Sequence, residues 1–184
     1  MNEGLISRRY AKALYEYAAT RQQEDGLYHR MQLLNHHLST MPRLKGALDN
    51  PAVSLKEKIS LLHNAAGGNP EQSYLDFIRL VLANRREKYL QKMTLSYQTL
   101  YRKKKNIRMV SLVSAREIQP EILSRIHKDV VESTHGTVRF STQTDPAIEG
   151  GFIFRLDDYR LDASVRNQLE KIRRQFIHKN RTIR

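Results

Sequence analysis

The chain has 184 residues, 40% of them hydrophobic and 28% charged, with no cysteine and a formal net charge of +13. This composition is typical of a globular protein with one domain or two small ones, and it excludes disulfides and thiolate metal sites. No apolar run approaches the roughly twenty residues that a membrane-spanning helix needs, and no secretory signal follows Met1, so we expect a cytosolic protein.

Two segments carry the whole positive charge. Residues 85–108 hold nine Lys or Arg against one Glu, a net +8, and residues 166–184 hold seven against one, a net +6. The remaining residues sum to −1. Such segments indicate an anionic partner, an anionic membrane surface or solvated helix faces, and charged helix faces most often serve solubility.

Hydrophobic periodicity predicts a first helix over residues 6–21. Its apolar side combines small alanines, which let another helix come close, with tyrosine rings that carry a polar tip. Apolar residues at helical spacing predict a second helix over residues 27–39, and a short helix follows Pro42.

Capping and turn signals define a fourth helix. Asn50-Pro51 breaks the preceding pattern, and Ser54 with Glu57 forms a capping box that opens a helix over residues 55–66. Gly67-Gly68 then ends this helix.

Two further helices complete the first part of the chain. We expect Asn69 to cap the fifth helix and Pro70 to take its first position. That helix pauses or ends around residues 84–86. The sixth starts at Tyr89 and runs into a basic stretch ending at Lys105, where cations suit a helix C-terminus.

The hydrophobic period changes after this basic stretch. Residues 107–113 alternate loosely and predict a strand. Pro120 starts a helix that ends at His135-Gly136, and residues 137–142 form a second predicted strand with Val138 and Phe140 on one face.

The stretch from Asp145 to Arg166 predicts a hairpin that feeds a last helix. Asp145-Pro146 opens a turn, and Gly150-Gly151 permits positive φ or a close backbone approach. Residues 152–156 follow as an apolar strand.

A tight reversal at Asp157-Asp158 leads into a last strand at residues 159–162, and Ser164 caps the terminal helix. The apolar residues of that helix are Leu169, Ile172, Phe176 and Ile177. We therefore predict an α+β protein: a six-helix N-terminal bundle, residues 1–105, followed by a small C-terminal domain of a mixed β-sheet with helices, residues 106–184.

No motif predicts a catalytic, cofactor-binding or metal site. His36-His37 points to two sides of its helix, and Asp157-Asp158 are ordinary turn residues. Gly67-Gly68 and Gly150-Gly151 lack the spacing of a nucleotide-binding loop. Ser164 has a capping role and no histidine in its segment before His178 to activate it.

One alternative is a basic helical RNA-binding protein. Tyr97 and Tyr101 lie beside the cations of residues 102–105, and stacking on RNA uses aromatic rings next to cations. The same tyrosines also continue the apolar stripe of their helix, and the second domain shows no RNA-binding signature of aromatic strand residues.

Four landmarks in order carry a family resemblance. They are Arg9-Tyr10-Ala11-Lys12-Ala13-Leu14; Asn50-Pro51 followed by Lys56-Glu57-Lys58; Phe77, Leu80 and Asn84 with Arg85 or Arg86; and, within residues 145–169, an Asp-Pro, a Gly-Gly before an apolar strand and an Asp-x-Ser-x-x-x-x-Leu. With these landmarks, nearly the whole chain resembles the delta subunit of F-type ATP synthases, called the oligomycin sensitivity-conferring protein in mitochondria.

The resemblance implies a non-catalytic subunit whose helical N-terminal domain receives the N-terminal helix of an alpha subunit of the catalytic head. The groove would lie between the first and fifth helices, a helix-in-groove arrangement. Its lining would comprise Tyr10, Ala13, Leu14, Tyr17, Phe77, Leu80 and Val81, with Asn84 and Arg85 at its end. The alternative is that Leu14 and Phe77 are only core residues.

The resemblance also implies that the C-terminal domain binds the b subunits of the peripheral stalk. The protein would then hold the head against rotation, so that proton flow drives ATP synthesis. On charge, the candidate surface for acidic residues of b is the last helix, through Arg166, Lys171, Arg173 and Arg174. The resemblance implies a monomer within the complex, peripheral at the cytoplasmic face of a bacterial inner membrane, with no membrane insertion, cofactor or nucleic acid.

Overall fold

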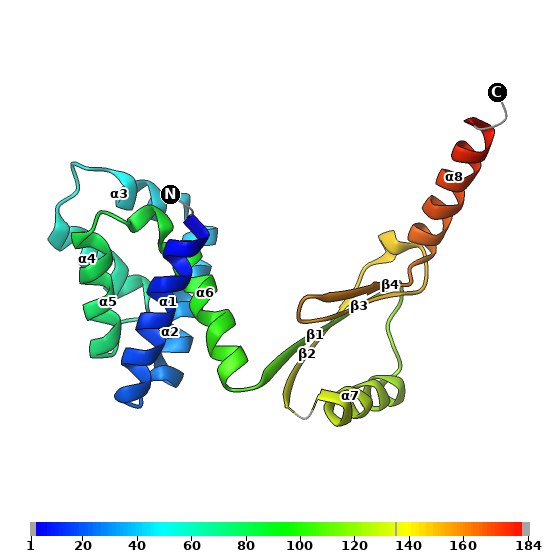
Figure 1. Cartoon of the computed structure of the whole chain (residues 1–184), viewed down its shortest axis with the longest axis horizontal. Coiled ribbons are helices and arrows are strands. Elements are labelled where there is room, and N and C mark those ends of the chain that lie inside the picture. Colours follow the sequence, from blue (N-terminus) through cyan, green and yellow to red (C-terminus); the bar gives the residue numbers. More distant parts are fainter. Residues whose placement is uncertain (1–2, 135, 182–184) are drawn as a thin grey trace. The chain divides into compact units, whose positions relative to one another are not determined.

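The computed structural model of the chain describes residues 3–134 and 136–181, with side chains up to residue 174. It divides into two compact units, residues 1–105 and 106–184. The elements of the first unit are α1 (Glu3–Thr20), α2 (Glu24–Thr40), α3 (Pro42–Asp49), α4 (Leu55–Ala65), α5 (Gln72–Ala83), η1 (Glu87–Tyr89) and α6 (Leu90–Lys104) (Figure 1).

The second unit contains a mixed four-stranded sheet. Its elements are β1 (Ile107–Ser114), α7 (Pro120–Thr134), β2 (Thr137–Thr144), η2 (Pro146–Ile148), β3 (Phe152–Leu156), β4 (Tyr159–Asp162) and α8 (Val165–Arg181). The predicted combination of helices with a mixed sheet is confirmed. So is the predicted order of strand, helix, three strands and helix.

The core of the first unit is formed by the apolar sides of its helices. Three tyrosines, Tyr28, Tyr74 and Tyr97, are its largest fully buried side chains. Each buried hydroxyl needs a hydrogen-bond partner: Tyr74 donates to the Leu62 carbonyl at 2.8 Å, and Tyr97 donates to the Glu24 carbonyl at 3.2 Å. Burial raises the pKa of both phenols.

The predicted fourth helix is confirmed at both ends. Ser54 Oγ accepts a hydrogen bond from the Glu57 amide at 3.3 Å, and the Glu57 carboxylate accepts one from the Ser54 amide at 2.8 Å. This reciprocal pair is the predicted capping box. Gly67 and Gly68 then take positive φ, +88° and +71°, as a helix stop requires.

The predicted start of the fifth helix is wrong. Asn69 adopts φ +39° instead of a capping conformation, and Pro70 lies outside the helix, which begins at Gln72 after Glu71. The cause is a contact from α2: the Arg30 guanidinium donates to the carbonyls of Ala66 at 2.9 Å and Asn69 at 3.3 Å, and lies 3.5 Å from the Glu71 carboxylate. These bonds hold the connecting loop away from helical geometry.

The pause predicted at residues 84–86 is confirmed. Asn84 ends α5, Arg85 has φ +51°, and the short helix η1 leads into α6. A buried ion pair fixes this turn, because Lys58 Nζ on α4 lies 2.9 Å from the Glu87 carboxylate.

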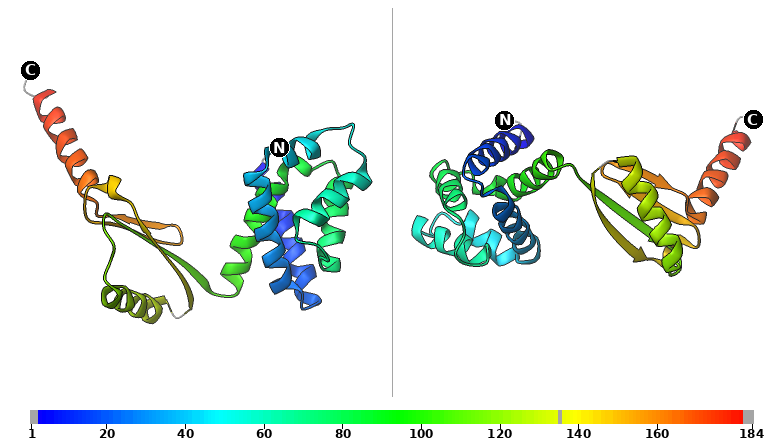
Figure 2. Two further views of the ribbon diagram at one scale, coloured as in Figure 1. Left: turned by 180° about the vertical axis from the view of Figure 1, so that it is seen from behind. Right: turned by 90° about the horizontal axis from the view of Figure 1, so that it is seen from below.

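In the sheet the strands lie in the order β2-β1-β3-β4. β1 pairs in parallel with β2, starting at Ile107 opposite Thr137, so α7 is the crossover helix of a β-α-β unit. Figure 2 shows α7 lying across one face of the sheet. β3 pairs antiparallel with both β1 and β4.

The hairpin and the cap before α8 are as predicted. Gly150 and Gly151 have positive φ, and Asp157, also at positive φ (+50°), accepts a hydrogen bond from the Met109 amide at 3.0 Å. Ser164 Oγ accepts one from the Asn167 amide at 3.2 Å. The predicted helix end at His135 lies outside the described residues, as do the side chains of Phe176 and Ile177.

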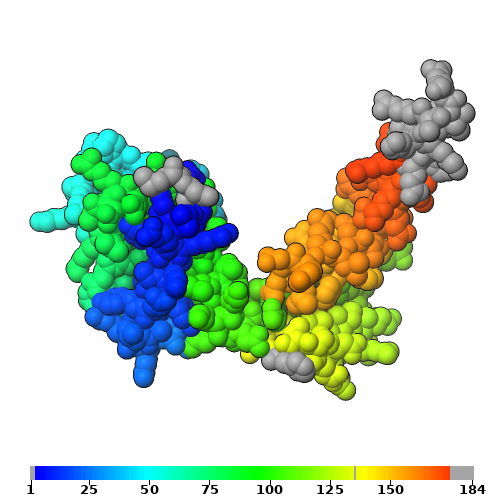
Figure 3. Space-filling model, viewed as in Figure 1, coloured from blue at the N-terminus to red at the C-terminus, as the bar shows by residue number. Residues whose placement is uncertain are grey.

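Within the second unit, α8 extends from the end of the hairpin (Figure 1), and no other part of the unit covers the face of its first turns that Figure 3 shows. Leu169 and Ile172 are 54% and 47% exposed. This helix therefore presents an apolar stripe that the unit itself does not cover.

Candidate functional site

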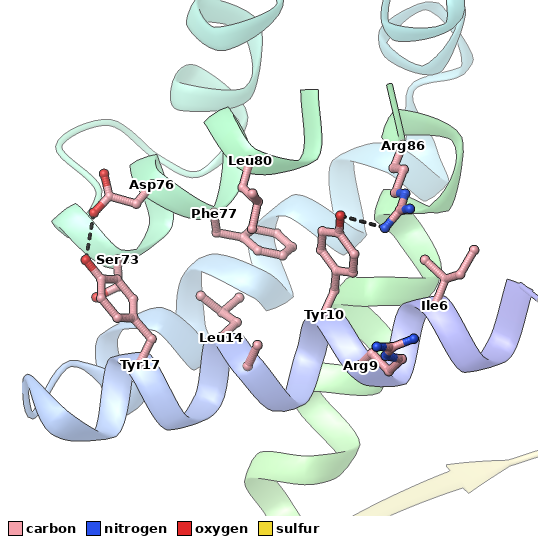
Figure 4. A pocket seen from close by; sticks show the side chains of 11 residues that line it. Ile6, Arg9, Tyr10, Leu14, Tyr17, Ser73, Asp76, Phe77, Leu80 and Arg86 are labelled. Carbon is pink, nitrogen blue, oxygen red and sulfur yellow. Dashed lines mark hydrogen bonds between the residues drawn. The ribbon is translucent and has the colours of Figure 1, made fainter. Parts of the chain in front are cut away.

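A cavity of about 730 Å³ lies between α1 and α5. Figure 4 shows the side chains of the two helices facing each other across it. Its lining comprises Ile6, Arg9, Tyr10, Ala13, Leu14 and Tyr17 from α1, Ser73, Asp76, Phe77 and Leu80 from α5, and Arg86 from the turn after α5. We call this cavity the α1/α5 groove.

The floor of the α1/α5 groove is apolar. Leu14 and Phe77 are 4% and 5% exposed, and the Tyr10 ring meets Phe77 edge-on with centroids 6.5 Å apart. Leu80 stands at the rim, 53% exposed. Ala13 is exposed but small. The groove is therefore open to solvent and has room for side chains of a second molecule.

Two hydrogen bonds fix the aromatic walls at opposite ends of the groove (Figure 4). The Tyr17 hydroxyl donates to the Asp76 carboxylate at 2.9 Å, and Arg86 Nη1 donates to the Tyr10 hydroxyl at 2.8 Å. Arg21 also covers the Tyr17 ring, 4.4 Å from its centroid. The tyrosine rings are held upright, so the groove is largely preformed.

The Tyr17–Asp76 hydrogen bond also shifts the pKa of both side chains. It is the main reason that the pKa of Tyr17 lies above its usual range and the pKa of Asp76 below it. Both shifts favour the neutral phenol donating to the ionised carboxylate. The Asp76 carboxylate is therefore ionised at neutral pH, with Arg79 3.6 Å away and Arg21 over the Tyr17 ring as neighbouring cations, and Arg86 supplies a positive charge at the other end.

Six of the predicted groove residues line this cavity together: Tyr10, Ala13, Leu14, Tyr17, Phe77 and Leu80. The other three do not line it. Val81 is fully buried in the core, Asn84 bonds back to the Leu80 carbonyl at 2.8 Å, and Arg85 is exposed beyond the turn. Leu14 and Phe77 are buried and also form the floor of the cavity, so their burial alone does not distinguish a core residue from a groove residue.

Sequence reasoning missed Ile6, Arg9, Ser73, Asp76 and Arg86 as lining residues. Four of them follow from helical spacing, because each precedes a predicted lining residue by one turn, such as Ile6 before Tyr10 and Asp76 before Leu80. Arg86 could not be found in this way. It reaches the groove only because the chain turns after α5.

The RNA-stacking hypothesis is wrong for the residues that suggested it. Tyr97 is fully buried, and Tyr101 is 8% exposed, with its ring stacked on Tyr28 at 4.2 Å. The Tyr101 hydroxyl donates to Asp25 at 2.9 Å, and burial together with this bond raises its pKa to about 12. Neither ring is available to stack on a base.

The four basic residues predicted on α8 are all exposed but do not share one face. Arg166 and Arg173 line a shallow cavity of about 360 Å³ together with Glu149, Leu169 and Glu170. Lys171 and Arg174 lie outside this lining, and Arg174 pairs with Glu170 at 2.9 Å.

Within residues 3–134 and 136–181, no cluster of three or more histidine or acidic side chains could hold a metal ion. Nor does any helix in these residues combine the length and apolarity needed to cross a bilayer. The α1/α5 groove is the candidate site, an open cavity with an apolar floor and with Asp76 and Arg86 towards its two ends.

Three comparisons with known proteins bear on this reading. The family model described as "ATP synthase delta (OSCP) subunit" matches residues 6–176. The chain is 48% identical over 181 residues to the ATP synthase subunit delta of Phocaeicola vulgatus, covering 98% of both chains. It is 46% identical to the ATP synthase subunit delta of Bacteroides thetaiotaomicron, over the full length of both.

Among solved structures, the chain is similar to a chain of the Toxoplasma gondii mitochondrial ATP synthase hexamer determined by cryo-electron microscopy. The TM-score is 0.71 at 20% sequence identity, covering 96% of this chain and 98% of that one. At this identity the similarity is one of fold.

Proposed function

Because this chain belongs to the ATP synthase delta (OSCP) subunit family, and so is a non-catalytic stator subunit of an F-type ATP synthase, we propose that its α1/α5 groove receives the N-terminal helix of an alpha subunit. The observation that carries the proposal is the convergence of six expected side chains, from two segments far apart in the sequence, on one open apolar cavity.

The shape of the groove suits an amphipathic helix. Helix-in-groove recognition needs an apolar floor, room for anchoring side chains and a polar rim. Leu14 and Phe77 supply the floor, Ala13 admits a close backbone, and Asp76 and Arg86 mark the two ends. A guest helix with apolar anchors one turn apart would cover the exposed Leu80.

The test is the affinity of the full-length chain for a synthetic peptide of the alpha N-terminus from the same organism, measured by isothermal titration calorimetry. We expect Leu80→Glu to weaken binding by at least about tenfold, because it introduces a charge where an apolar anchor packs. Leu80 is 53% exposed, so the variant should stay folded. Leu14 is unsuitable for this test because it also belongs to the core.

The matched control is Leu61→Glu, a change of the same kind at a 37% exposed position on α4. It should bind the peptide as the wild type does. Saturable binding to wild type that Leu80→Glu leaves intact would place the alpha helix elsewhere and overturn the proposal.

For the second unit, we propose that α8 binds the b subunits of the peripheral stalk. What supports this is the exposed combination of an apolar stripe, Leu169 and Ile172, with exposed cations that include Arg166 and Arg173. An amphipathic partner helix with acidic flanks would cover both. In this arrangement the protein joins head and stalk, and the head cannot turn with the rotor.

The corresponding test uses a soluble fragment of b and the full chain carrying both Arg166→Glu and Arg173→Glu. We expect a loss of affinity of about tenfold or more, since two attractive contacts become repulsive. Lys128→Glu on α7 is the control, because Lys128 is exposed and its pairing with Glu132 at 3.9 Å is loose. Equal losses in both variants would show only a nonspecific effect of net charge.

We further propose a peripheral location at the cytoplasmic face of the bacterial membrane. The chain would be held there only through its partner subunits. Membrane vesicles depleted of the enzyme's head should therefore lose this chain when the stalk is removed as well, and retention on bare lipid would contradict the assignment.

A further inference from the structure

A second groove lies on the other side of α1, where this helix packs against α6. Its cavity measures about 520 Å³ and is lined by Arg8, Ala11, Lys12, Leu95, Ser96, Thr99, Leu100 and Lys103. At about 100° per residue, Arg8, Ala11 and Lys12 face away from the α1 residues of the α1/α5 groove. We call this second cavity the α1/α6 groove.

The floor of the α1/α6 groove is apolar. Ala11 is 2% exposed, and its small side chain keeps the floor low between the two helices. Leu95 is 47% exposed on the α6 side. An exposed leucine beside a buried alanine offers one apolar contact that the unit itself leaves uncovered.

The charge of the α1/α6 groove is positive throughout. Its lining has three cations, Arg8, Lys12 and Lys103, and no carboxylate. Lys12 is 72% exposed and lies 3.8 Å from Glu16, a loose pair. For Arg8 and Lys103, no ion-pair partner occurs among the residues that the structure describes.

Other cations of the same helix pair are already neutralised. Lys92 on α6 pairs with Glu3 on α1. Lys105 lies 3.0 Å from Glu24 and 2.9 Å from Asp25. Three of the cations on this helix pair that lack a close ion pair among the described residues, Arg8, Lys12 and Lys103, lie together along the α1/α6 groove, whereas Arg9, Arg102 and Lys104 lie outside its lining.

We propose that the α1/α6 groove docks an acidic amphipathic helix of a partner protein. The partner helix would cover Leu95 with an apolar side chain. Its carboxylates would pair with Arg8 and Lys12 on α1 and with Lys103 on α6. Two other anionic partners fit less well. Binding of single-stranded nucleic acid combines cations with exposed aromatic rings, and the lining has no aromatic ring. A lipid surface binds a protruding apolar face, whereas this apolar floor is recessed between helices.

This surface goes beyond the proposed function, because it is separate from the α1/α5 groove. The two grooves lie on opposite faces of α1 within one unit, so two helices can bind α1 at the same time. The first unit would then hold one helix mainly through apolar anchors and a second one mainly through charge.

The probe is a synthetic helical peptide with a leucine stripe flanked by glutamates, compared with the same peptide carrying glutamine in place of each glutamate. Binding to the full chain is followed by fluorescence anisotropy at low and physiological salt. We expect saturable binding of the glutamate peptide. We also expect about tenfold weaker binding of the glutamine peptide, since charge pairing supplies the difference.

Three variants locate the binding. The double variant with Lys12→Glu and Lys103→Glu should bind the glutamate peptide about tenfold more weakly, or worse, than the wild type does. Lys45→Glu, an exposed cation on α3, should leave binding unchanged. Leu80→Glu should also leave it unchanged, which separates this groove from the α1/α5 groove. Far-ultraviolet circular dichroism confirms that each variant is folded.

Three outcomes would overturn the proposal. The first is that neither peptide binds. The second is that the Leu80→Glu variant loses the peptide while the double charge reversal keeps it. The third is that vesicles of anionic lipid, or single-stranded RNA, bind through Lys12 and Lys103 while the glutamate peptide does not.

Discussion

At the scale of single residues, two glycines show that the same residue type has opposite roles in this chain. Gly151 has φ +73°, and an added Cβ would lie 2.2 Å from the Ala163 carbonyl oxygen. Gly46 lies inside α3, and an added Cβ there meets nothing within 4 Å. The backbone around Gly151 therefore depends on glycine, whereas that around Gly46 does not.

We expect Gly151→Ala to destabilise the second unit by more than about 1 kcal/mol, because both the backbone angle and the contact with Ala163 must change. Gly46→Ala should stabilise the first unit by about 0.5–1 kcal/mol, since alanine is the better helix former. Hydrogen exchange of the full chain, resolved to each unit by mass spectrometry, measures both changes in stability. Unchanged protection of β3 and β4 in Gly151→Ala would show that the close approach is not required.

The Tyr17–Asp76 hydrogen bond gives a prediction about pH. It lowers the pKa of Asp76, so its contribution to stability is present above the unfolded-state pKa of about 4 and is lost as pH falls through the lower folded-state value. Tyr17→Phe should raise the pKa of Asp76 towards its ordinary value and should cost stability at pH 7 but not at pH 2. Carboxyl NMR titration measures the shift.

Tyr10→Phe is the matched control for this titration. Tyr10 lies at the other end of the groove and bonds to Arg86 instead. If both variants move the pKa of Asp76 equally, the cause is a general change in the groove and not the Tyr17 hydroxyl.

At the scale of elements, the sequence predicted structure best where its causes are local. The capping box at Ser54 and Glu57 lies within four residues of chain, and the structure has it as expected. The predicted start of α5 is wrong because Asn69-Pro70 is a good local signal that a distant side chain overrides. Arg30, on α2, binds the carbonyls of the loop, and no local pattern contains that contact.

The same distinction explains the candidate site. The family resemblance supplied six of the eleven residues that line the α1/α5 groove, and these six lie on one face of each helix. Val81 was predicted to line the groove, but its side chain is fully buried in the core. The arginine that reaches the groove is Arg86 and not the predicted Arg85. Arg85 takes φ +51° in the turn, and the next side chain, Arg86, then reaches Tyr10 on α1. Sequence spacing cannot report the direction of such a turn.

The buried ion pair between α4 and η1 offers a test of packing between elements. The side chains of Lys58 and Glu87 are only 8% and 16% exposed. Lys58→Met should destabilise the first unit by about 3 kcal/mol, because it leaves a buried carboxylate unpaired. Adding Glu87→Gln should recover much of the loss, since the remaining group is then neutral. Urea unfolding of the first unit measures both variants.

Lys56→Met, an exposed change on the same helix, should alter the free energy of unfolding by less than about 0.5 kcal/mol. A single variant at Lys58 no less stable than this control would mean that the ion pair contributes nothing net. A double variant as unstable as Lys58→Met would point to lost packing and not to the unpaired charge.

At the scale of the whole molecule, the two units have very unequal cores. Of the buried apolar side chains in the part of the chain that the structure describes, 21 belong to the first unit and four, Val110, Leu112, Val130 and Ile148, to the second. The second unit instead exposes large apolar side chains on its sheet and on both helices. Burial of apolar area is the main favourable term in folding, so the second unit has much less to stabilise it.

This difference predicts two unfolding transitions in the full chain. The second unit should unfold at lower urea concentration and exchange its amide hydrogens faster, because few buried apolar contacts oppose local opening. A soluble fragment of b, which we propose binds α8, should slow exchange in β3, β4 and α8 by mass action on the folded state. The fragment should leave exchange in α1 and α5 unchanged, whereas the alpha peptide should slow exchange in α1 and α5 alone.

A single unfolding transition with equal protection in both units would show that the second unit, despite its small core, is no less stable than the first. Protection by b confined to the first unit would place the stalk contact there, and the assignment of head and stalk to separate units would fail.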